Sequence, residues 1–256
     1  MRIILIRHGE SEGNIDDYAY VEKGDEAVGL TDKGWLQARG TGKFLNTLYK
    51  EMGLTQSPYL FVSSYQRTKE TLSGINKGLD PEFHGEPHED PLLVEQSFGV
   101  LAHIKHQKNP IKRMFGKLLF HFAKSAYEGT PFSSTTPFGE SPKQMYAAAK
   151  QFAGTLERDR MEGKEVCTIV AHGATIKALM MVYGHLPMSA WKDLKTPGNG
   201  DVIVIDLPDP NSGEKYRSIR KVWDGVKGTV ENLNPIEHIK RLTKETLPVY
   251  PEHLVP

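Results

Sequence analysis

The stretch Ile3-Ile4-Leu5-Ile6-Arg7-His8-Gly9-Glu10 decides how the rest of the chain can fold. Its first four residues are apolar and mostly β-branched, which predicts a buried strand. The apolar run stops at Arg7-His8-Gly9, and Gly9 allows a sharp turn or a close backbone approach. In open α/β sheets, ligands bind just beyond the carboxyl ends of strands. We therefore expect Arg7 and His8 to stand at a binding edge.

Strand-like and helix-like segments alternate along the chain after this first strand. The predicted strands are 59–62, 92–94, 166–171, 201–207 and 216–223, and the predicted helices begin near residues 31, 71, 141 and 176. The connection Pro208–Gly213 suggests that the last two strands pair antiparallel. This alternation predicts an α/β fold, a three-layer sandwich with a mostly parallel central sheet and helices on both faces.

Two segments interrupt the alternation. Residues 78–91 are rich in turn-forming and charged residues and are predicted to be a loop. Residues 101–138 contain an amphipathic helix that begins at Asn109-Pro110, and we expect it to form a helical cap whose apolar face packs over the carboxyl edge of the sheet. Residues 224–256 are polar, with one short helix expected at about 235–247.

Composition excludes several classes of protein. The chain has 256 residues, 38% hydrophobic and 25% charged, with a formal net charge of zero. These values suit one sizeable globular domain and give no general attraction to nucleic acid or anionic membrane, so we expect neither as a partner. No apolar run approaches a membrane span, and the single Cys167 excludes an internal disulfide, so we expect a cytoplasmic protein with an inert core thiol.

Basic side chains follow three of the predicted strands. Arg7 and His8 end the first strand, Arg67 follows the second, and His172-Gly173 follows the strand at 166–171; Glu95 follows the weaker strand at 92–94. An arginine in such a place often forms only a surface ion pair. Together, however, two guanidinium groups and two imidazoles at one sheet edge predict an anion pocket, and a neutral imidazole can also act as a nucleophile.

The segment Arg7-His8-Gly9-Glu10-Ser11-Glu12-Gly13-Asn14 resembles the R-H-G-E-x-x-x-N signature of the histidine phosphatase superfamily, the phosphoglycerate mutase-like proteins. Further segments resemble blocks of that family in the same order, up to about residue 206. They are Leu30-Thr31 with Gly34 and Gln37-Ala38, Ser64-x-x-Arg67-Thr68, Glu95 before Phe98-Gly99, Gly139-Glu140-Ser141, Ala171-His172-Gly173 and Asn199-Gly200. The resemblance implies one histidine phosphatase domain over 1–223, with a cap insertion at about 101–138 and a C-terminal extension at 224–256.

The resemblance also implies a role for each site residue. His8 would attack phosphorus and become a phosphohistidine, while Arg7, Arg67 and His172 would neutralise the phosphoryl oxygens. Glu95 would protonate the leaving oxygen, which requires a raised pKa and thus partial burial. The remaining expected phosphate contacts are Asn14 and Gly173, with Ser11 and Ser64 as further candidates. No metal or other cofactor is expected.

The resemblance leaves the exact activity open. Cofactor-dependent mutases of the family carry paired arginines in a W-R-R-S-like segment after the acid, whereas this chain has a single Arg113 in a lysine-rich block. The sequence therefore favours a phosphomonoesterase acting on a small phosphorylated metabolite. The alternatives are a phosphoglycerate mutase, a sugar bisphosphatase or, on the same fold, a non-catalytic phosphate-binding module.

Weaker signals give further alternatives. Glu89 or Asp90 could hold the acid role, and Lys112, Arg113 or Lys117 of the cap could meet a second anionic group of the substrate. The spacings His84-x-Glu86-x-His88 and His103-x-x-His106 could suit a metal, but solvated polar residues of a loop or of the insertion explain them better. Specificity is expected in the cap, the 15–29 loop and the C-terminal extension, and the oligomeric state is left open.

Overall fold

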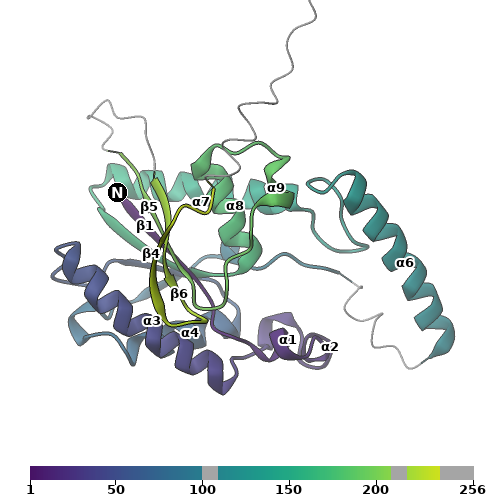
Figure 1. Ribbon diagram of the computed structural model, residues 1–256, viewed down its shortest axis with the longest axis horizontal. Coiled ribbons are helices and arrows are strands. Elements are labelled where there is room, and N and C mark those ends of the chain that lie inside the picture. Colours follow the sequence, from purple (N-terminus) through teal and green to yellow (C-terminus); the bar gives the residue numbers. More distant parts are fainter. Residues whose placement is uncertain (100–108, 209–217, 237–256) are drawn as a thin grey trace, which may run out of the picture.

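The computed structural model describes residues 1–99, 109–208 and 218–236, and a seven-stranded sheet runs through the middle of this part of the chain (Figure 1). The strand order is β3-β2-β4-β1-β5-β6-β7. The first four of these pair parallel, and the later pairings are antiparallel. The bounds are β1 Arg2–Arg7, β2 Tyr59–Val62, β3 Pro87–Glu89, β4 Val166–Ala171, β5 Val202–Asp206, β6 Ser218–Asp224 and β7 Thr229–Leu233.

Helices cover both faces of this sheet, as predicted. In Figure 1, α3 and α4 lie on one side of the strands and α7 and α8 on the other. The predicted α/β class is confirmed, with parallel strands on one side of β1 and an antiparallel addition on the other. The bounds are α1 Glu12–Ile15, α2 Tyr18–Lys23, α3 Asp32–Glu51, α4 Gln66–Asn76, α6 Pro110–Gly129, α7 Pro142–Met161, α8 Gly173–Gly184 and α9 Ala190–Asp193.

The apolar run in β1 divides its side chains between the two layers. Ile3 and Leu5 belong to the core under α7 and α8, whereas Ile4 and Ile6 belong to the core under α3 and α4. All four are fully buried. Successive side chains of a strand point to opposite faces, so a strand covered on both sides must be apolar at every position.

The prediction of a strand at residues 92–94 is wrong. Residues Pro91–Leu93 form a 3-10 helix, because the Asp90 carboxylate accepts a hydrogen bond from the Leu92 amide at 2.8 Å and Pro91 starts the turn. The strand lies just before it, as β3, inside the segment predicted to be a loop. An edge strand with all three residues exposed needs no apolar pattern, so the sequence did not reveal it.

Two segments, 12–27 and 224–233, contain elements that their sequence patterns did not predict. The segment predicted to be irregular between Ser11 and Leu30 contains α1, α2 and a 3-10 helix at Asp25–Ala27. After residue 223, β7 pairs antiparallel with β6 as a short hairpin. The helix expected at about 235–247 falls almost entirely outside the described residues.

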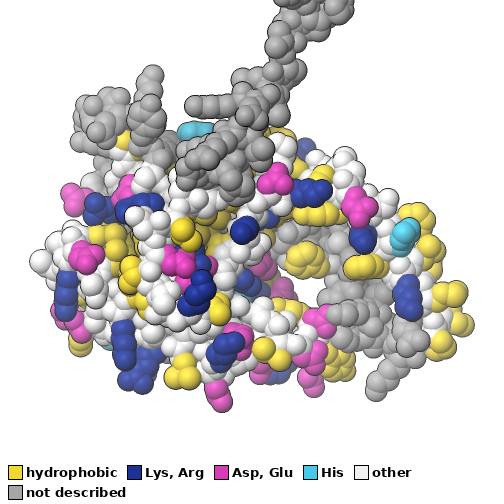
Figure 2. Space-filling view, viewed as in Figure 1, with side chains coloured by type: hydrophobic (Ala, Val, Ile, Leu, Met, Phe, Trp, Pro, Cys, Tyr) yellow, Lys and Arg dark blue, Asp and Glu magenta, His cyan; other side chains and the backbone are white. Residues whose placement is uncertain are grey.

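Helix α6 begins at the predicted Asn109 cap, whose side chain accepts from the amides of Ile111 and Lys112. Its apolar face, however, does not pack on the sheet. Figure 1 shows α6 standing away from the main body, and Figure 2 shows hydrophobic side chains on the outer surface of this arm. Exposed fractions from 50% to 72% belong to Ile111, Met114, Phe115, Leu118, Phe120 and Phe122. The expectation that this face packs over the carboxyl edge of the sheet is therefore wrong for these six residues, although Ala123 and Tyr127 of the same helix line the pocket beside Glu95.

Cys167 is a buried free thiol in β4, and burial raises its pKa, which agrees with an inert core residue. Within the described residues, no helix is long and apolar enough to cross a membrane.

Candidate active site

The site lies at the carboxyl edge of the parallel strands, where the chain leaves β1, β2 and β4. Arg7 is the last residue of β1 and pairs in register with Ala171 of β4, so His8 and His172 occupy matching positions on neighbouring strands. Their ring centroids are 5.2 Å apart. Arg67 lies in the first turn of α4, after β2. The parallel register thus brings residues from distant segments to one place.

His8 is buried, and one hydrogen bond determines which of its ring nitrogens carries the proton. Its Nδ1 lies 2.7 Å from the carbonyl oxygen of Gly9. A carbonyl only accepts, so Nδ1 carries the proton and donates it. Burial, together with the charges of Arg67 and Arg7, lowers the pKa of His8 well below its usual value. At neutral pH the ring is therefore uncharged, and Nε2 keeps its lone pair.

His172 is also buried, and it faces a hydroxyl. Its Nε2 lies 2.8 Å from the Ser63 Oγ, which itself accepts a long hydrogen bond of 3.5 Å from the Tyr65 amide. The Ser63 hydroxyl can donate to Nε2 or accept from it, and where it donates, the ring proton of a neutral His172 lies on Nδ1. Burial makes the largest contribution to lowering the pKa of His172 well below its usual value. Among the described residues, Nδ1 has no hydrogen-bond partner.

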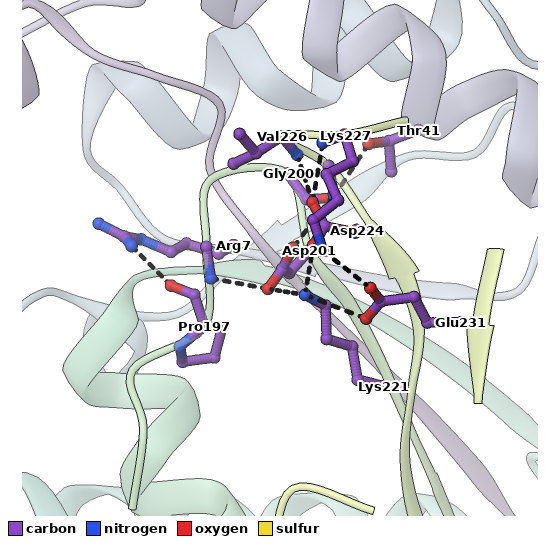
Figure 3. A network of polar contacts seen from close by, with 12 residues as sticks. Arg7, Thr41, Pro197, Gly200, Asp201, Lys221, Asp224, Val226, Lys227 and Glu231 are labelled. Carbon is purple, nitrogen blue, oxygen red and sulfur yellow. Dashed lines mark hydrogen bonds and ion pairs between the residues drawn. The ribbon is translucent and has the colours of Figure 1, made fainter. Parts of the chain in front are cut away.

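The loop that precedes β5 holds Arg7 in position through two hydrogen bonds. Its guanidinium donates to the carbonyl of Pro197 at 2.6 Å, and its backbone amide donates to the carbonyl of Asp201 at 3.2 Å (Figure 3). The Asp201 carboxylate in turn accepts from the Gly198 amide and pairs with Lys221 at 3.0 Å. A buried polar network therefore sets the position of Arg7.

Arg67 is only 1% exposed and is clamped by α2 and the segment that follows it. Its Nη1 lies 2.9 Å from the Asp25 carboxylate and donates to the Asp25 carbonyl at 2.7 Å. The guanidinium carbon also lies 4.9 Å from the centroid of the Tyr65 ring. The Nε atoms of both Arg7 and Arg67 are buried without a hydrogen-bond partner among the described residues. An oxyanion is the kind of group that satisfies such donors.

Glu95 lies against the beginning of α8. Its carboxylate accepts from the amides of Gly173 at 3.0 Å, Ala174 at 3.1 Å and Gln96 at 3.0 Å. These amides and the two arginines favour the charged form, but burial outweighs them and raises the pKa of Glu95. The alternatives Glu89 and Asp90 serve elsewhere, because Glu89 pairs with Lys69 and Asp90 caps the 3-10 helix.

The remaining predicted phosphate contacts lie at the rim of the site or belong to its support. Asn14 is exposed and accepts from Asn199 at 3.0 Å and from the Ser11 amide at 3.0 Å. Ser11 is buried at the start of α1. The Gly173 amide is engaged by Glu95, and Ser64 is exposed.

Three residues that contact the site residues were not among the predicted site residues. Ser63, rather than its neighbour Ser64, contacts His172. Asp25 holds Arg67, and Asn199 donates to the carbonyls of His8 and Gly9 at 3.2 and 3.3 Å. The ordered match at Asn199-Gly200 was the one signal available for Asn199, whereas nothing in the sequence indicated Asp25.

The histidine spacings that could suit a metal do not bring a set of metal ligands together in the described residues. In the described part of the chain, no group of three or more His, Cys, Asp and Glu side chains could hold a metal ion. The His84 ring contacts the Leu79 carbonyl, while the His88 ring stacks on Tyr59. His103 and His106 lie outside the described residues.

The fold and the site together define a class: an α/β protein with two arginines beside a neutral, buried histidine at the carboxyl edge of its sheet. Comparison with known proteins gives the family. The family model "Histidine phosphatase superfamily (branch 1)" matches residues 3–215. The chain belongs to the histidine phosphatase superfamily.

Individual relatives include both mutase-like proteins and phosphatases. Phosphoglycerate mutase-like protein AT74 of Arabidopsis thaliana is 31% identical over 221 residues, and the match spans 80% of this chain but only 65% of that protein. A 2,3-bisphosphoglycerate-dependent phosphoglycerate mutase of Maricaulis maris is 26% identical, with 86% and 93% covered. The solved structure of a putative alpha-ribazole-5'-P phosphatase from Escherichia coli has the same fold, with a TM-score of 0.62, 19% identity and coverage of 86% and 95%.

Proposed function

We propose that this protein is a phosphomonoesterase that hydrolyses a small phosphorylated metabolite through a phosphohistidine intermediate. The observation that carries the proposal is the state of His8. Its Nδ1 proton is committed to the Gly9 carbonyl, and burial keeps the ring neutral, so Nε2 is available as a nucleophile beside two arginines. Membership of the family and the phosphatases among its structural neighbours support the same reaction type.

The reaction divides into two transfers. In the first, the His8 Nε2 lone pair forms a bond to phosphorus while the ester P–O bond breaks, and Glu95 gives its proton to the departing oxygen. In the second, the Glu95 carboxylate takes a proton from water as the water oxygen bonds to phosphorus and the N–P bond breaks. Arg7, Arg67 and the His172 Nδ1 proton face the charge that builds on the phosphoryl oxygens.

The second candidate is a phosphoglycerate mutase, which the sequence relatives favour. Such an enzyme would return the phosphoryl group from His8 to another hydroxyl of the substrate instead of to water. The absence of the paired arginines supports hydrolysis, and so do the exposed positions of Lys112 and Lys117 on α6, outside the pocket beside Glu95. A sugar bisphosphatase would use the same two steps with a second phosphate on the substrate.

Replacement of the nucleophile tests the proposal. We expect His8→Ala to abolish hydrolysis of p-nitrophenyl phosphate and to prevent acid-quench trapping of a labelled phosphoryl group on the protein. Circular dichroism should show that the fold is retained. The matched control is His84→Ala, since His84 is exposed and lies outside the site. Activity that survives in His8→Ala would overturn the phosphohistidine mechanism.

A product assay separates the two candidate functions. With 3-phosphoglycerate as substrate, phosphorus NMR should show inorganic phosphate accumulating for a phosphatase. Accumulation of 2-phosphoglycerate instead would identify a mutase.

A further inference from the structure

Helix α6 carries large apolar side chains on a surface that faces solvent. Five of them recur at the three- and four-residue spacing of a helix, and each is between 50% and 72% exposed: Ile111, Met114, Phe115, Leu118 and Phe122. At about 100° per residue, these five residues share an arc of about 100° around the helix axis. We call them the outer face of α6. A contiguous exposed surface of this kind marks a site of contact with another molecule or with a membrane.

The opposite side of α6 already belongs to the domain. Ala123 and Tyr127 line the pocket beside Glu95, and Gly116 is buried. On the helical wheel these three residues lie more than about 120° from the centre of the outer face. Figure 2 shows hydrophobic side chains on the outer surface of this arm of the molecule. The outer face can therefore meet another surface while the pocket wall stays in place.

Exposed lysines flank the outer face at both of its edges. Lys112 lies beyond one edge, and Lys117 and Lys124 lie beyond the other. The sequence of α6 contains a single acidic residue, Glu128, whose carboxylate is 3.9 Å from the Lys124 ammonium. Lysine stems can lie along an apolar surface and hold their ammonium groups at its polar boundary. The arrangement therefore matches a boundary between an apolar layer and an anionic layer.

The formal net charge of zero, from which we expected no anionic membrane as a partner, is an average over 256 residues. Helix α6 departs from that average, because its sequence has three lysines and one arginine against one glutamate. Attraction to a surface acts over about 10 Å at ordinary ionic strength, so the local balance of charge decides it.

We propose that the outer face of α6 binds the surface of a bilayer that contains anionic phospholipids. The helix axis would lie parallel to the surface, with the five apolar side chains among the upper parts of the acyl chains and the flanking lysines at the phosphate groups. Within the described residues no helix could cross a membrane, and binding at the surface requires none. The inference does not depend on the phosphomonoesterase proposed above.

A second copy of this chain fits the outer face less well. If the outer faces of two copies packed together, the lysines at both edges of one would lie against those of the other. Each α6 would bring only Glu128 to offset them, and like charges side by side are destabilising. The helix also stands away from the main body as a single rod, which offers a peptide no groove (Figure 1). A planar anionic surface suits both the charge and the shape.

Flotation of the full chain with lipid vesicles tests the inference. We expect the protein to float at low salt with vesicles of phosphatidylcholine and phosphatidylserine in equal parts, and to float much less with phosphatidylcholine alone or at high salt. Phe115→Ser and Phe122→Ser should each weaken partitioning about tenfold or more, because a buried aromatic ring is lost. The matched control is Phe120→Ser, since Phe120 is 59% exposed but lies on the opposite side of α6.

Charge reversal gives a second, independent test. Lys117→Glu should weaken partitioning about fivefold or more, whereas Lys43→Glu, an exposed lysine of α3, should have little effect. Circular dichroism should show that every variant is folded. Wild-type protein that floats with neither vesicle would overturn the inference, and so would equal losses in Phe115→Ser and Phe120→Ser. A wild-type dimer in sedimentation equilibrium that Phe115→Ser dissociates, together with no flotation, would identify a second copy as the occupant instead.

Discussion

His8 and His172 carry the same side chain at matching positions of adjacent strands, yet their hydrogen bonds differ. The Gly9 carbonyl requires a proton on Nδ1 of His8, whereas the Ser63 hydroxyl can donate to Nε2 of His172. His8 therefore keeps the Nε2 lone pair, and a neutral His172 whose Nε2 accepts from Ser63 carries its proton on Nδ1. A one-residue difference in either strand register would separate the two rings.

Glu95 gives a prediction at this scale. We expect Glu95→Gln to lower kcat/KM for an alkyl phosphate about 10²- to 10⁴-fold, because the amide cannot protonate the leaving alkoxide. The loss for p-nitrophenyl phosphate should be much smaller, since nitrophenolate is a stable leaving group. Equal losses for the two substrates would contradict an acid role. The exposed Glu51 provides the control Glu51→Gln.

The pH dependence follows from the same group. The wild-type rate should fall as pH rises through the raised pKa of Glu95, because the acid is lost there. The nucleophile should not limit the rate in that range, since the lowered pKa of His8 keeps its ring neutral. Glu95→Gln should remove the decline at high pH from the alkyl phosphate profile.

At the scale of elements, α6 and α7 show how similar sequence patterns reach different outcomes. Each helix has 20 residues, a proline in its first turn and apolar residues at helical spacing. The apolar face of α7 is buried against α8 and the sheet, while that of α6 is exposed. Amphipathicity predicts a helix with an apolar face, but it does not say which surface lies within reach of that face.

Two phenylalanines test this difference. Phe152 of α7 is fully buried, and Phe122 of α6 is 62% exposed. We expect Phe152→Ala to lower the free energy of unfolding by about 3–5 kcal/mol through the cavity it leaves. Phe122→Ala should change it by no more than about 0.5 kcal/mol. Urea unfolding followed by circular dichroism measures both, and a large loss in Phe122→Ala would show that α6 packs on the body in solution.

For the molecule as a whole, the network behind Arg7 connects the site to the antiparallel half of the sheet. Lys221 of β6 contacts the carboxylates of Asp201, Asp224 and Glu231, at 3.0, 3.0 and 3.3 Å (Figure 3). Asp201 holds the backbone of Arg7 and the loop that receives its guanidinium. The strands that lie outside the parallel half therefore help to position Arg7 in the candidate site.

This network predicts how stability depends on acid. Amide and lysine contacts outweigh burial and lower the pKa of Asp224 to about 2. A lowered carboxyl pKa stabilises the fold above the unfolded-state value, and that contribution is lost as pH falls through about 2. Asp224→Asn should therefore destabilise the protein by about 1–2 kcal/mol at pH 7, and the difference from wild type should narrow between pH 4 and pH 2.

Unfolding midpoints in urea at pH 7, 5, 4 and 3 measure the effect. A difference between Asp224→Asn and wild type that stays constant over this range would contradict the assignment. Glu51→Gln serves again as the control, because Glu51 is exposed at the end of α3.

The sequence by itself determined the layers of the fold and the central part of the site. Buried strands covered on both faces are apolar throughout, so β1 and β4 were recognisable, and the polar residues at their ends marked the edge where the candidate site lies. The ordered motifs then indicated the family. The edge strand β3 escaped prediction because an exposed edge carries no such pattern.

Only the tertiary structure decided which side chains support the site. Asp25 reaches Arg67 across 42 residues, and Asn199 reaches the His8 carbonyl across 191 residues. The tertiary structure also placed Lys177 among the residues that line the pocket beside Glu95, and it left the apolar face of α6 exposed. Hydrophobic periodicity indicates only which face of a helix or strand is buried. Contacts between distant segments depend on how the elements pack, and no local pattern encodes that.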